Sequence, residues 1–317
     1  MCYIKLMEKF HNFIWQQSEK SDAKREKKFK DFKFDNCKVI KNIRYGTKKD
    51  YNLFDYYYPI NYTKPLPIII NLHGGGYVSG KKELNRLISE FWASKGFCVI
   101  CPNYTLVKKE KFPEPILDVF KLFNYITTNF SRNKFDLNNI FLAGNSAGAH
   151  IGSLAVCILN SKTLQQKYKV KSTIKIKACA FSSGIFHLIN FYNITPLSDA
   201  YKNLIIGENY KNNPLSNYFS AIDLVNEKFP PCFCVSELGD ISLGHTKKFC
   251  KTLKSLKVDV KLELTNGSHC FNVTNPTTKK SKKVNEAIID FFKIQMFNTK
   301  NKEIKVGNIM KNDDFCK

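Results

Sequence analysis

The chain has 317 residues, enough for one large α/β domain with insertions or for two small domains. Its hydrophobic content of 43% and charged content of 24% are ordinary for a soluble globular protein, so a sizeable core can be buried. No apolar stretch approaches the length that crosses a bilayer, so we expect no integral membrane segment.

The positive charge of the chain is carried almost entirely by lysine. The formal net charge is +23, from 50 Lys and Arg against 27 Asp and Glu, yet only Arg25, Arg44, Arg86 and Arg132 are arginine. Proteins that read nucleic acids rely on the planar fork of arginine, and no nucleic-acid motif accompanies the lysines. We therefore expect a solvated basic surface and no nucleic-acid partner.

The chain contains eleven cysteines, and several lie in apolar runs that favour buried strands. Cys98 and Cys101 have the spacing C-x-x-C, but no second cysteine pair or histidine pair completes a zinc site. Buried free thiols are typical of a reducing compartment. No long apolar leader follows the charged N-terminal residues. We expect a cytoplasmic protein that holds no metal.

Apolar residues recur at helical spacing near the N-terminus, so residues 1–33 are predicted to be helical. This pattern favours a helix that packs on its own domain and covers the mouth of an active site; a helix on a membrane surface is the alternative. Two β-rich runs follow, Cys37–Tyr45 and Tyr51–Tyr58, and they predict a hairpin at a sheet edge.

Strands and helices then alternate along the chain. The predicted strands are Leu66–Leu72, Phe97–Pro102, Ile140–Ala143 and Ile174–Phe181, and the predicted helices are Glu83–Lys95, Ile116–Ile126 and Ala149–Leu159. This alternation predicts an α/β fold with a mostly parallel central sheet and helices on both faces.

The alternation stops over residues 185–228, which are rich in Asn, Tyr, Phe and Pro and predict an insertion at the carboxyl edge of the sheet. It resumes with strands at Pro231–Ser236 and Val258–Leu264 and helices at Leu243–Leu256 and Lys279–Phe297. We therefore divide the chain into an N-terminal helical segment (1–35), a core (36–184 and 229–297), an insertion (185–228) and a loose C-terminal tail (298–317).

The segment Phe141–His150 carries the main functional signal. An apolar strand ends in Gly144-Asn145-Ser146-Ala147-Gly148, and a segment of small and apolar residues follows. The pattern G-x-S-x-G is typical of a nucleophile elbow, a sharp strand–turn–helix that exposes the serine hydroxyl. Glycines flank the turn because a Cβ there would collide with the neighbouring strand and helix. Ser146 is therefore the candidate nucleophile.

A serine hydroxyl needs a base, and the base needs an orienting acid. After a nucleophile elbow, the acid and then the histidine follow the serine in chain order. Only His245 and His269 come late enough, and His269 follows the last strand, whereas His245 lies near a helix start. The other histidines precede the serine, lie on its helix or open the insertion: His11, His73, His150 and His187.

His269 follows the predicted strand Val258–Leu264. The acid is expected at the end of the preceding predicted strand, Pro231–Ser236. Asp240 occupies that place in Ser236-Glu237-Leu238-Gly239-Asp240. Glu237 competes, but it lies closer to the strand itself, and Asp259 begins the next strand. We therefore favour Asp240 as the acid.

A tetrahedral intermediate carries an oxyanion that needs N–H donors. Gly74-Gly75-Gly76 follow a strand and can approach it closely, because glycines have no side chain. Ala147, directly after the nucleophile, supplies a further N–H group. His73 is interpreted as an anchor of the glycine loop rather than as a proton carrier.

Together these motifs resemble the hormone-sensitive-lipase-like group of α/β hydrolases, which includes bacterial carboxylesterases and arylacetamide deacetylases. The likeness covers most of residues 60–295 and includes Asn103-Tyr104, Phe112-Pro113 and His269-Cys270-Phe271. It implies an α/β-hydrolase fold and ester hydrolysis without a cofactor. It also implies a helical cap, which the N-terminal segment (1–35) and the insertion (185–228) would form as cap segment and cap insertion. By the pattern of the group, the oxyanion donors are the N–H groups of Gly75, Gly76 and Ala147.

The chain departs from the pattern of that group at three places. Asn145 stands where the group has Asp, Thr105–Glu110 replaces Arg-Leu-Ala-Pro-Glu, and Ile241-Ser242 replaces Pro-Leu. None of these changes removes a catalytic atom, so they bear on substrate range and loop geometry. The glycine and serine motifs also resemble kynurenine-formamidase-like relatives, so amide or formamide hydrolysis is an alternative. A hydrolase fold that only binds a ligand is another.

The sequence thus predicts a serine carboxylesterase whose partner is a small-molecule ester with a short to medium acyl chain. Ser146 would attack the carbonyl, His269 would carry the proton, and Asp240 would orient the imidazole. The sequence leaves the alcohol part of the substrate and the oligomeric state open.

Overall fold

The computed structural model describes residues 2–191, 198–207 and 210–310. Eight strands form one sheet in the order β1-β2-β4-β3-β5-β6-β7-β8. Only the pairings of β1 with β2 and of β2 with β4 are antiparallel, so the sheet is mostly parallel, as predicted. The strands are β1 (Cys37–Arg44), β2 (Leu53–Pro59), β3 (Leu66–Leu72), β4 (Cys98–Pro102), β5 (Phe135–Asn145), β6 (Ile176–Ser182), β7 (Cys232–Glu237) and β8 (Val260–Thr265).

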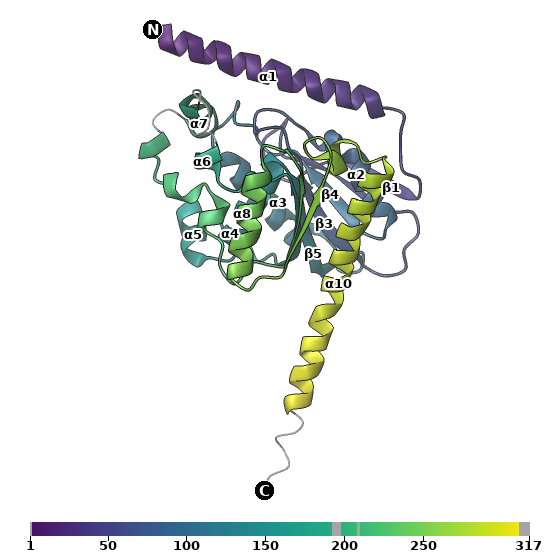
Figure 1. Ribbon diagram of the computed structural model, residues 1–317. Coiled ribbons are helices and arrows are strands. Elements are labelled where there is room, and N and C mark those ends of the chain that lie inside the picture. The colour runs from purple at the N-terminus through teal and green to yellow at the C-terminus, as the bar shows by residue number, and fades with distance from the viewer. Residues whose placement is uncertain (1, 192–197, 208–209, 311–317) are drawn as a thin grey trace.

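Helices cover both faces of this sheet (Figure 1). One apolar core joins the sheet to α3 (Glu114–Asn129), α4 (Ala147–Leu159), α5 (Lys162–Tyr168) and α8 (Leu243–Ser255). A second core on the other face joins it to α2 (Arg86–Ser94), α9 (Phe271–Thr274) and α10 (Lys279–Met310). The strand β3 shows why the sheet lies in the middle, since all seven of its residues are buried. Strands buried on both faces are typical of parallel sheets.

Helix α1 (Cys2–Phe29) lies across one end of the sheet (Figure 1). Its C-terminal half is fastened there by Arg25, which donates to the carbonyl oxygens of Leu84 and Val273. Ion pairs add to this attachment: Glu26 with Lys81 at 2.8 Å and Glu19 with Lys108 at 3.1 Å. The helix predicted for residues 1–33 is thus present, and it packs on its own domain through polar contacts.

The described part of residues 185–228 forms short helical segments and contributes no strand to the sheet. These are α6 (Leu188–Phe191), α7 (Ser198–Ile206) and the 3-10 turns η3 (Tyr210–Asn212), η4 (Ser216–Tyr218) and η5 (Ala221–Asp223). His150 on α4 ties this segment to the core, because its Nε2 lies 2.6 Å from the carbonyl oxygen of Phe219. Part of the predicted insertion, residues 192–197 and 208–209, lies outside the described residues.

Two boundaries differ by five residues or more from those predicted. Strand β5 begins at Phe135 rather than at Ile140, because Leu66 and Pro67 of β3 pair with Phe135 and Asp136 although those residues continue into a polar stretch. Helix α10 runs on to Met310, so the segment predicted as a loose tail from residue 298 begins as helix. Residues 311–317 of that tail lie outside the described residues.

Nine cysteines have described side chains; all nine are free thiols, and eight of them are buried. Cys98 and Cys101 lie on β4 and are not paired with each other. Burial raises the pKa of Cys101 to about 12. The predicted buried thiols are therefore confirmed for this part of the chain. Across the described residues, no helix combines the length and apolar character that a membrane span requires.

Candidate active site

Ser146 lies in a strained turn between β5 and α4. Its backbone has φ 52° and ψ −116°, a conformation that residues other than glycine rarely adopt. The turn is held in place because Ser146 donates its backbone N–H to the carbonyl oxygen of Ser182, at 2.9 Å. A non-glycine residue in such strain is a marker of a functional site.

The two glycines of the turn are required by close packing. A Cβ on Gly144 would lie 2.5 Å from the carbonyl oxygen of Gly148, and one on Gly148 would lie 2.2 Å from that of Leu72. Helix α4 therefore begins directly against β3 and β5. Ala147 is its first residue, so its N–H group belongs to the first turn, which has no helical partner.

The glycine loop follows β3 and reaches the same place. Gly75 and Gly76 have φ values of 119° and 58°, and a Cβ on Gly75 would lie 2.2 Å from the carbonyl oxygen of Ser79. A Cβ on Gly74 would lie 2.6 Å from the Nδ2 atom of Asn145. The loop can thus approach the elbow only because it consists of glycines.

His73 anchors this loop. Its ring stacks on Tyr104 with centroids 4.2 Å apart, and its Nδ1 lies 2.7 Å from the carbonyl oxygen of Gly74. Tyr104 donates its hydroxyl to the carbonyl oxygen of His73 at 2.7 Å. Burial lowers the pKa of His73 to about 4, so the ring is neutral at physiological pH. A buried, neutral and stacked ring suits the predicted anchoring role.

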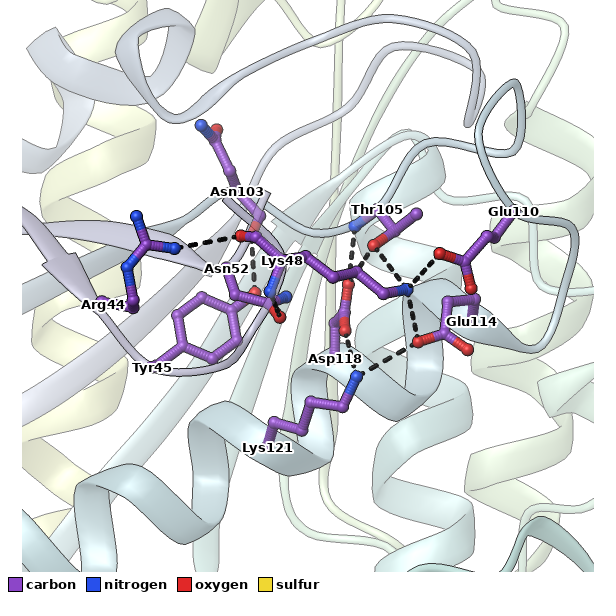
Figure 2. A network of polar contacts seen from close by, with 10 residues as sticks. All are labelled: Arg44, Tyr45, Lys48, Asn52, Asn103, Thr105, Glu110, Glu114, Asp118 and Lys121. Carbon is purple, nitrogen blue, oxygen red and sulfur yellow. Dashed lines mark hydrogen bonds and ion pairs between the residues drawn. The ribbon is translucent and has the colours of Figure 1, made fainter. Parts of the chain in front are cut away.

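A polar network holds Thr105, the residue that follows Tyr104 in the chain (Figure 2). Asp118 on α3 is fully buried and accepts hydrogen bonds from both the backbone N–H and the hydroxyl of Thr105, at 2.9 Å and 2.5 Å. Lys48, from the loop between β1 and β2, donates to Thr105 and pairs with Glu110 and Glu114. The loop after β4 is therefore held by charged groups from two other elements.

His269 and Asp240 are brought together at the next strand ends. The Nδ1 atom of His269 lies 2.8 Å from Oδ2 of Asp240. Asp240 is buried and also accepts from the backbone N–H and hydroxyl of Ser242, at 2.7 Å and 2.5 Å. Burial opposes ionisation of this carboxyl, but the hydrogen bonds from Ser242 and the neighbouring His269 outweigh it and lower the pKa of Asp240.

The same pairing changes the basicity of His269. Burial disfavours the charged imidazolium, but the thiol of Cys270 and the carboxylate of Asp240 outweigh that effect and raise the pKa of His269 to about 10. Because Nδ1 is bound to Asp240, Nε2 is the ring nitrogen left to exchange a proton with another group.

Ser146, His269 and the glycine loop line one cleft of about 420 Å³. Asn145 and Cys270 belong to the same lining, and α1 contributes one wall through Gln17, Ser18, Ser21, Asp22 and Arg25. Asp22 accepts from the backbone N–H of Gly80 at 3.0 Å, which fixes this wall against the glycine loop. The sequence carried no local signal for these α1 residues, because their approach depends on contacts with distant loops.

The remaining late or nearby histidines serve other contacts. His150 is buried, contacts Phe219, and has its pKa lowered to about 4 by burial. His187 lies 3.1 Å from the hydroxyl of Ser220 and 3.3 Å from Asp223. His245 lies in the first turn of α8, and it is not among the described residues that line the cleft. The side chain of His11 lies outside the description.

A match to a protein-family model shows the family to which the chain belongs. The family model described as BD-FAE matches residues 54–248, more than half of the chain. The chain belongs to the BD-FAE family. This assignment and the esterase among the curated relatives confirm the predicted group of esterase-type α/β hydrolases.

Individual relatives are distant in sequence. The chain is 25% identical over 228 residues to a putative alpha/beta hydrolase of Acanthamoeba polyphaga mimivirus, covering 68% of this chain and 63% of that protein. It is 25% identical over 232 residues to esterase LipQ of Mycobacterium tuberculosis, covering 71% and 54%. The chain thus spans between about half and two thirds of the length of these relatives.

A solved structure of similar shape confirms the fold. Esterase B from Lactobacillus rhamnosis superposes with a TM-score of 0.86 at 22% identity, covering 96% of this chain and 99% of the other. The chain therefore has the predicted α/β-hydrolase fold.

Proposed function

We propose that the protein is a serine hydrolase that cleaves carboxylic esters through an acyl-enzyme intermediate. The observation that carries this proposal is the shared cleft, in which a strained serine, a carboxylate-bound histidine and a glycine loop meet. A relative in sequence and a solved structure of similar shape are also named esterases. The domain division into cap segment, core, cap insertion and tail belongs to this proposal, with α1 as one wall of the cleft.

In the proposed mechanism, Ser146 attacks the ester carbonyl while Nε2 of His269 accepts the hydroxyl proton. The C–O bond to the alcohol breaks as His269 returns that proton to the leaving oxygen, which leaves an acyl group on Ser146. Water then repeats the cycle and releases the acid. Asp240 holds the imidazole tautomer and stabilises the imidazolium at both stages.

Negative charge develops on the carbonyl oxygen in each half of the reaction. The N–H groups of Gly75, Gly76 and Ala147 are the proposed donors to that oxygen. Removing one such donor from an enzyme costs about 3–4 kcal/mol of transition-state stabilisation. The mechanism uses side chains and backbone of this chain alone.

The decisive experiment measures turnover of p-nitrophenyl acetate and p-nitrophenyl butyrate by the wild-type protein and by Ser146→Ala. We expect turnover by the wild type and its loss in the variant. Equal rates in the two proteins would end the proposal. A fluorophosphonate probe should label the wild type at Ser146 and leave Ser146→Ala unlabelled; absence of labelling favours a fold that only binds a ligand.

The finer predictions from the sequence stay proposals. These are a small-molecule ester substrate with a short to medium acyl chain, the absence of a nucleic-acid partner and a cytoplasmic location. An aryl formamide, included in the substrate panel, tests the amide alternative directly. A higher kcat/KM for the formamide than for the acetate would favour that alternative.

A further inference from the structure

Glu237 is a fully buried carboxylate at the end of β7, three residues before Asp240. It does not replace Asp240 as the partner of His269, because Nδ1 of His269 is bound to Asp240. Its own bonds go elsewhere: Oε2 accepts the hydroxyl of Ser183 at 2.6 Å, and Oε1 accepts the backbone N–H of Phe271 at 3.1 Å. Phe271 directly follows His269 and Cys270, which line the cleft, and Ser183 directly follows β6.

Ser183 links Glu237 to Cys270, the residue that follows His269. Its hydroxyl oxygen accepts the backbone N–H of Cys270 at 3.1 Å while its hydrogen goes to Glu237. Ser183 is itself fully buried and directly follows β6, where it donates its backbone N–H to the carbonyl oxygen of Val235 at 2.8 Å. The two backbone N–H groups that follow His269 are thus both held by one buried pair.

The backbone at Cys270 explains why this restraint is needed. Cys270 has φ 54° and ψ 36°, the left-handed region that residues other than glycine disfavour. An unrestrained loop would relax toward ordinary backbone angles and would turn the imidazole of His269 away from its present place. Strain of this kind persists only where surrounding contacts over-determine it.

We propose that Glu237 is a positioning residue of this hydrolase, which acts through Ser183, Cys270 and Phe271 to hold the imidazole of His269 between Asp240 and Ser146. The inference rests on the proposed function for its kinetic consequence. Its structural consequence, a weakened contact between His269 and Asp240, does not depend on that function.

The same three groups also invite a metal reading. Glu237, Asp240 and His269 offer ligand atoms within 4.8 Å of one another. In the structure, however, Glu237 accepts from two N–H or O–H donors, and Asp240 accepts from Ser242 and binds His269. These hydrogen bonds fit a carboxylate that positions a loop.

The test compares Glu237→Ala, Glu237→Gln and Ser183→Ala with the control Glu90→Ala. Glutamine keeps one acceptor oxygen but turns an NH₂ group toward one of the two donors, so it removes part of the restraint. Glu90 is a buried glutamate on α2 that accepts the backbone N–H of Phe34 at 3.0 Å and pairs with Arg86. Its removal matches the loss of a buried, hydrogen-bonded carboxylate without touching the cleft.

The first readout is kinetic. We expect kcat on p-nitrophenyl acetate to fall about 10-fold to 100-fold in Glu237→Ala, because small displacements of a reacting group cost rates of that order. KM should stay within about two-fold, since the carboxylate does not border the cleft. Glu237→Gln and Ser183→Ala should show smaller losses in kcat, and Glu90→Ala should match the wild type.

The second readout is spectroscopic and needs no activity. The Nδ1 proton shared by His269 and Asp240 should give a low-field proton resonance, assigned by its loss in Asp240→Asn. We expect it to broaden or shift upfield in the Glu237 variants and in Ser183→Ala, and to stay unchanged in Glu90→Ala. An unchanged resonance and an unchanged kcat in Glu237→Gln and Ser183→Ala would overturn the inference, even where Glu237→Ala fails to fold.

The two readouts separate the inference from the proposed function. If the wild type hydrolyses no ester but the resonance is lost on removing Glu237, the positioning role stands and the proposed function fails. If the wild type is active and the variants are normal in both readouts, the proposed function stands and the positioning role fails.

Discussion

The rings of His73 and Tyr104 stack with their planes only 11° apart, and the Tyr104 hydroxyl donates to the carbonyl oxygen of His73. This pair joins the glycine loop after β3 to the loop after β4. The second loop is in turn held by Asp118 through Thr105 (Figure 2). The position of the proposed oxyanion donors therefore depends on side chains that do not line the cleft.

Tyr104→Phe tests this dependence because it keeps the stacked ring and removes the hydroxyl. The lost hydrogen bond should cost about 1 kcal/mol of folding stability, the usual net value for one hydrogen bond. We also expect kcat to fall several-fold with KM nearly unchanged, since the oxyanion forms only in the transition state. Urea denaturation and ester kinetics measure the two effects, and an unaltered kcat would show that the loop keeps its place without this bond.

The pH dependence of activity follows from the raised pKa of His269. The proposed base must be neutral to accept the Ser146 proton, and its pKa is raised to about 10 after the Cys270 and Asp240 contacts outweigh burial. The rate kcat/KM should therefore rise with pH across the neutral and alkaline range. Asp240→Asn removes one of these contacts, so its acid limb should move to lower pH while the maximal rate falls by about 10⁴. A limb that stays in place would contradict this origin of the shift.

The same titration has a definite sign for stability. The folded-state pKa of His269 lies above its ordinary value of 6.5, so the folded protein binds this proton more tightly than the unfolded chain does. The stabilisation from His269 is fully present below about pH 6.5 and is lost as the pH rises through about 10. Urea denaturation of wild type and His269→Gln should therefore differ most at low pH and converge at high pH.

Much of the candidate site was predictable because its signals are local or follow chain order. The spacing Gly144-Asn145-Ser146-Ala147-Gly148 marks a turn by itself, and the order of acid and histidine after the serine left only Asp240 and His269 well placed. In the structure, Nδ1 of His269 lies 2.8 Å from Oδ2 of Asp240.

The rest depends on contacts that no local pattern records. Glu237 looked like a competing acid, and its bonds to Ser183 and Phe271 exist only because three strand ends meet. Arg25 lies in the predicted N-terminal helix, yet it donates to the carbonyl oxygens of Leu84 and Val273, which are far away in the chain. The early start of β5 at Phe135 likewise comes from pairing with β3, which overrides a polar sequence.

His150 provides a test of how the insertion is held. Its Nε2 lies 2.6 Å from the carbonyl oxygen of Phe219, and its ring lies beside Tyr77 and Phe112, with centroids 5.7 Å away in each case. His150→Ala leaves a cavity and a buried carbonyl oxygen without its partner, so we expect a loss of about 2–5 kcal/mol in folding stability. Limited proteolysis should then cut within residues 185–228 faster than in the wild type. Equal cleavage rates would show that other contacts hold this segment.

Gly148 offers the sharpest test of the elbow geometry, because Gly244 on another helix serves as a control. An added Cβ would meet a backbone atom at Gly148 but open space at Gly244. A Cβ at Gly148 would lie 2.2 Å from the carbonyl oxygen of Leu72, a backbone atom that cannot move without shifting β3. Gly148→Ala should therefore cost about 3 kcal/mol or more, the upper range for overpacking, and should displace Ser146 enough to abolish ester turnover. Gly244 on α8 has no atom within 4 Å of an added Cβ, so Gly244→Ala should leave turnover unchanged and stabilise the protein by up to about 1 kcal/mol. Thermal unfolding and ester turnover of the two variants, measured side by side, separate a steric clash at the elbow from a general effect of alanine, and similar behaviour of the two would argue against the close packing of α4 on β3.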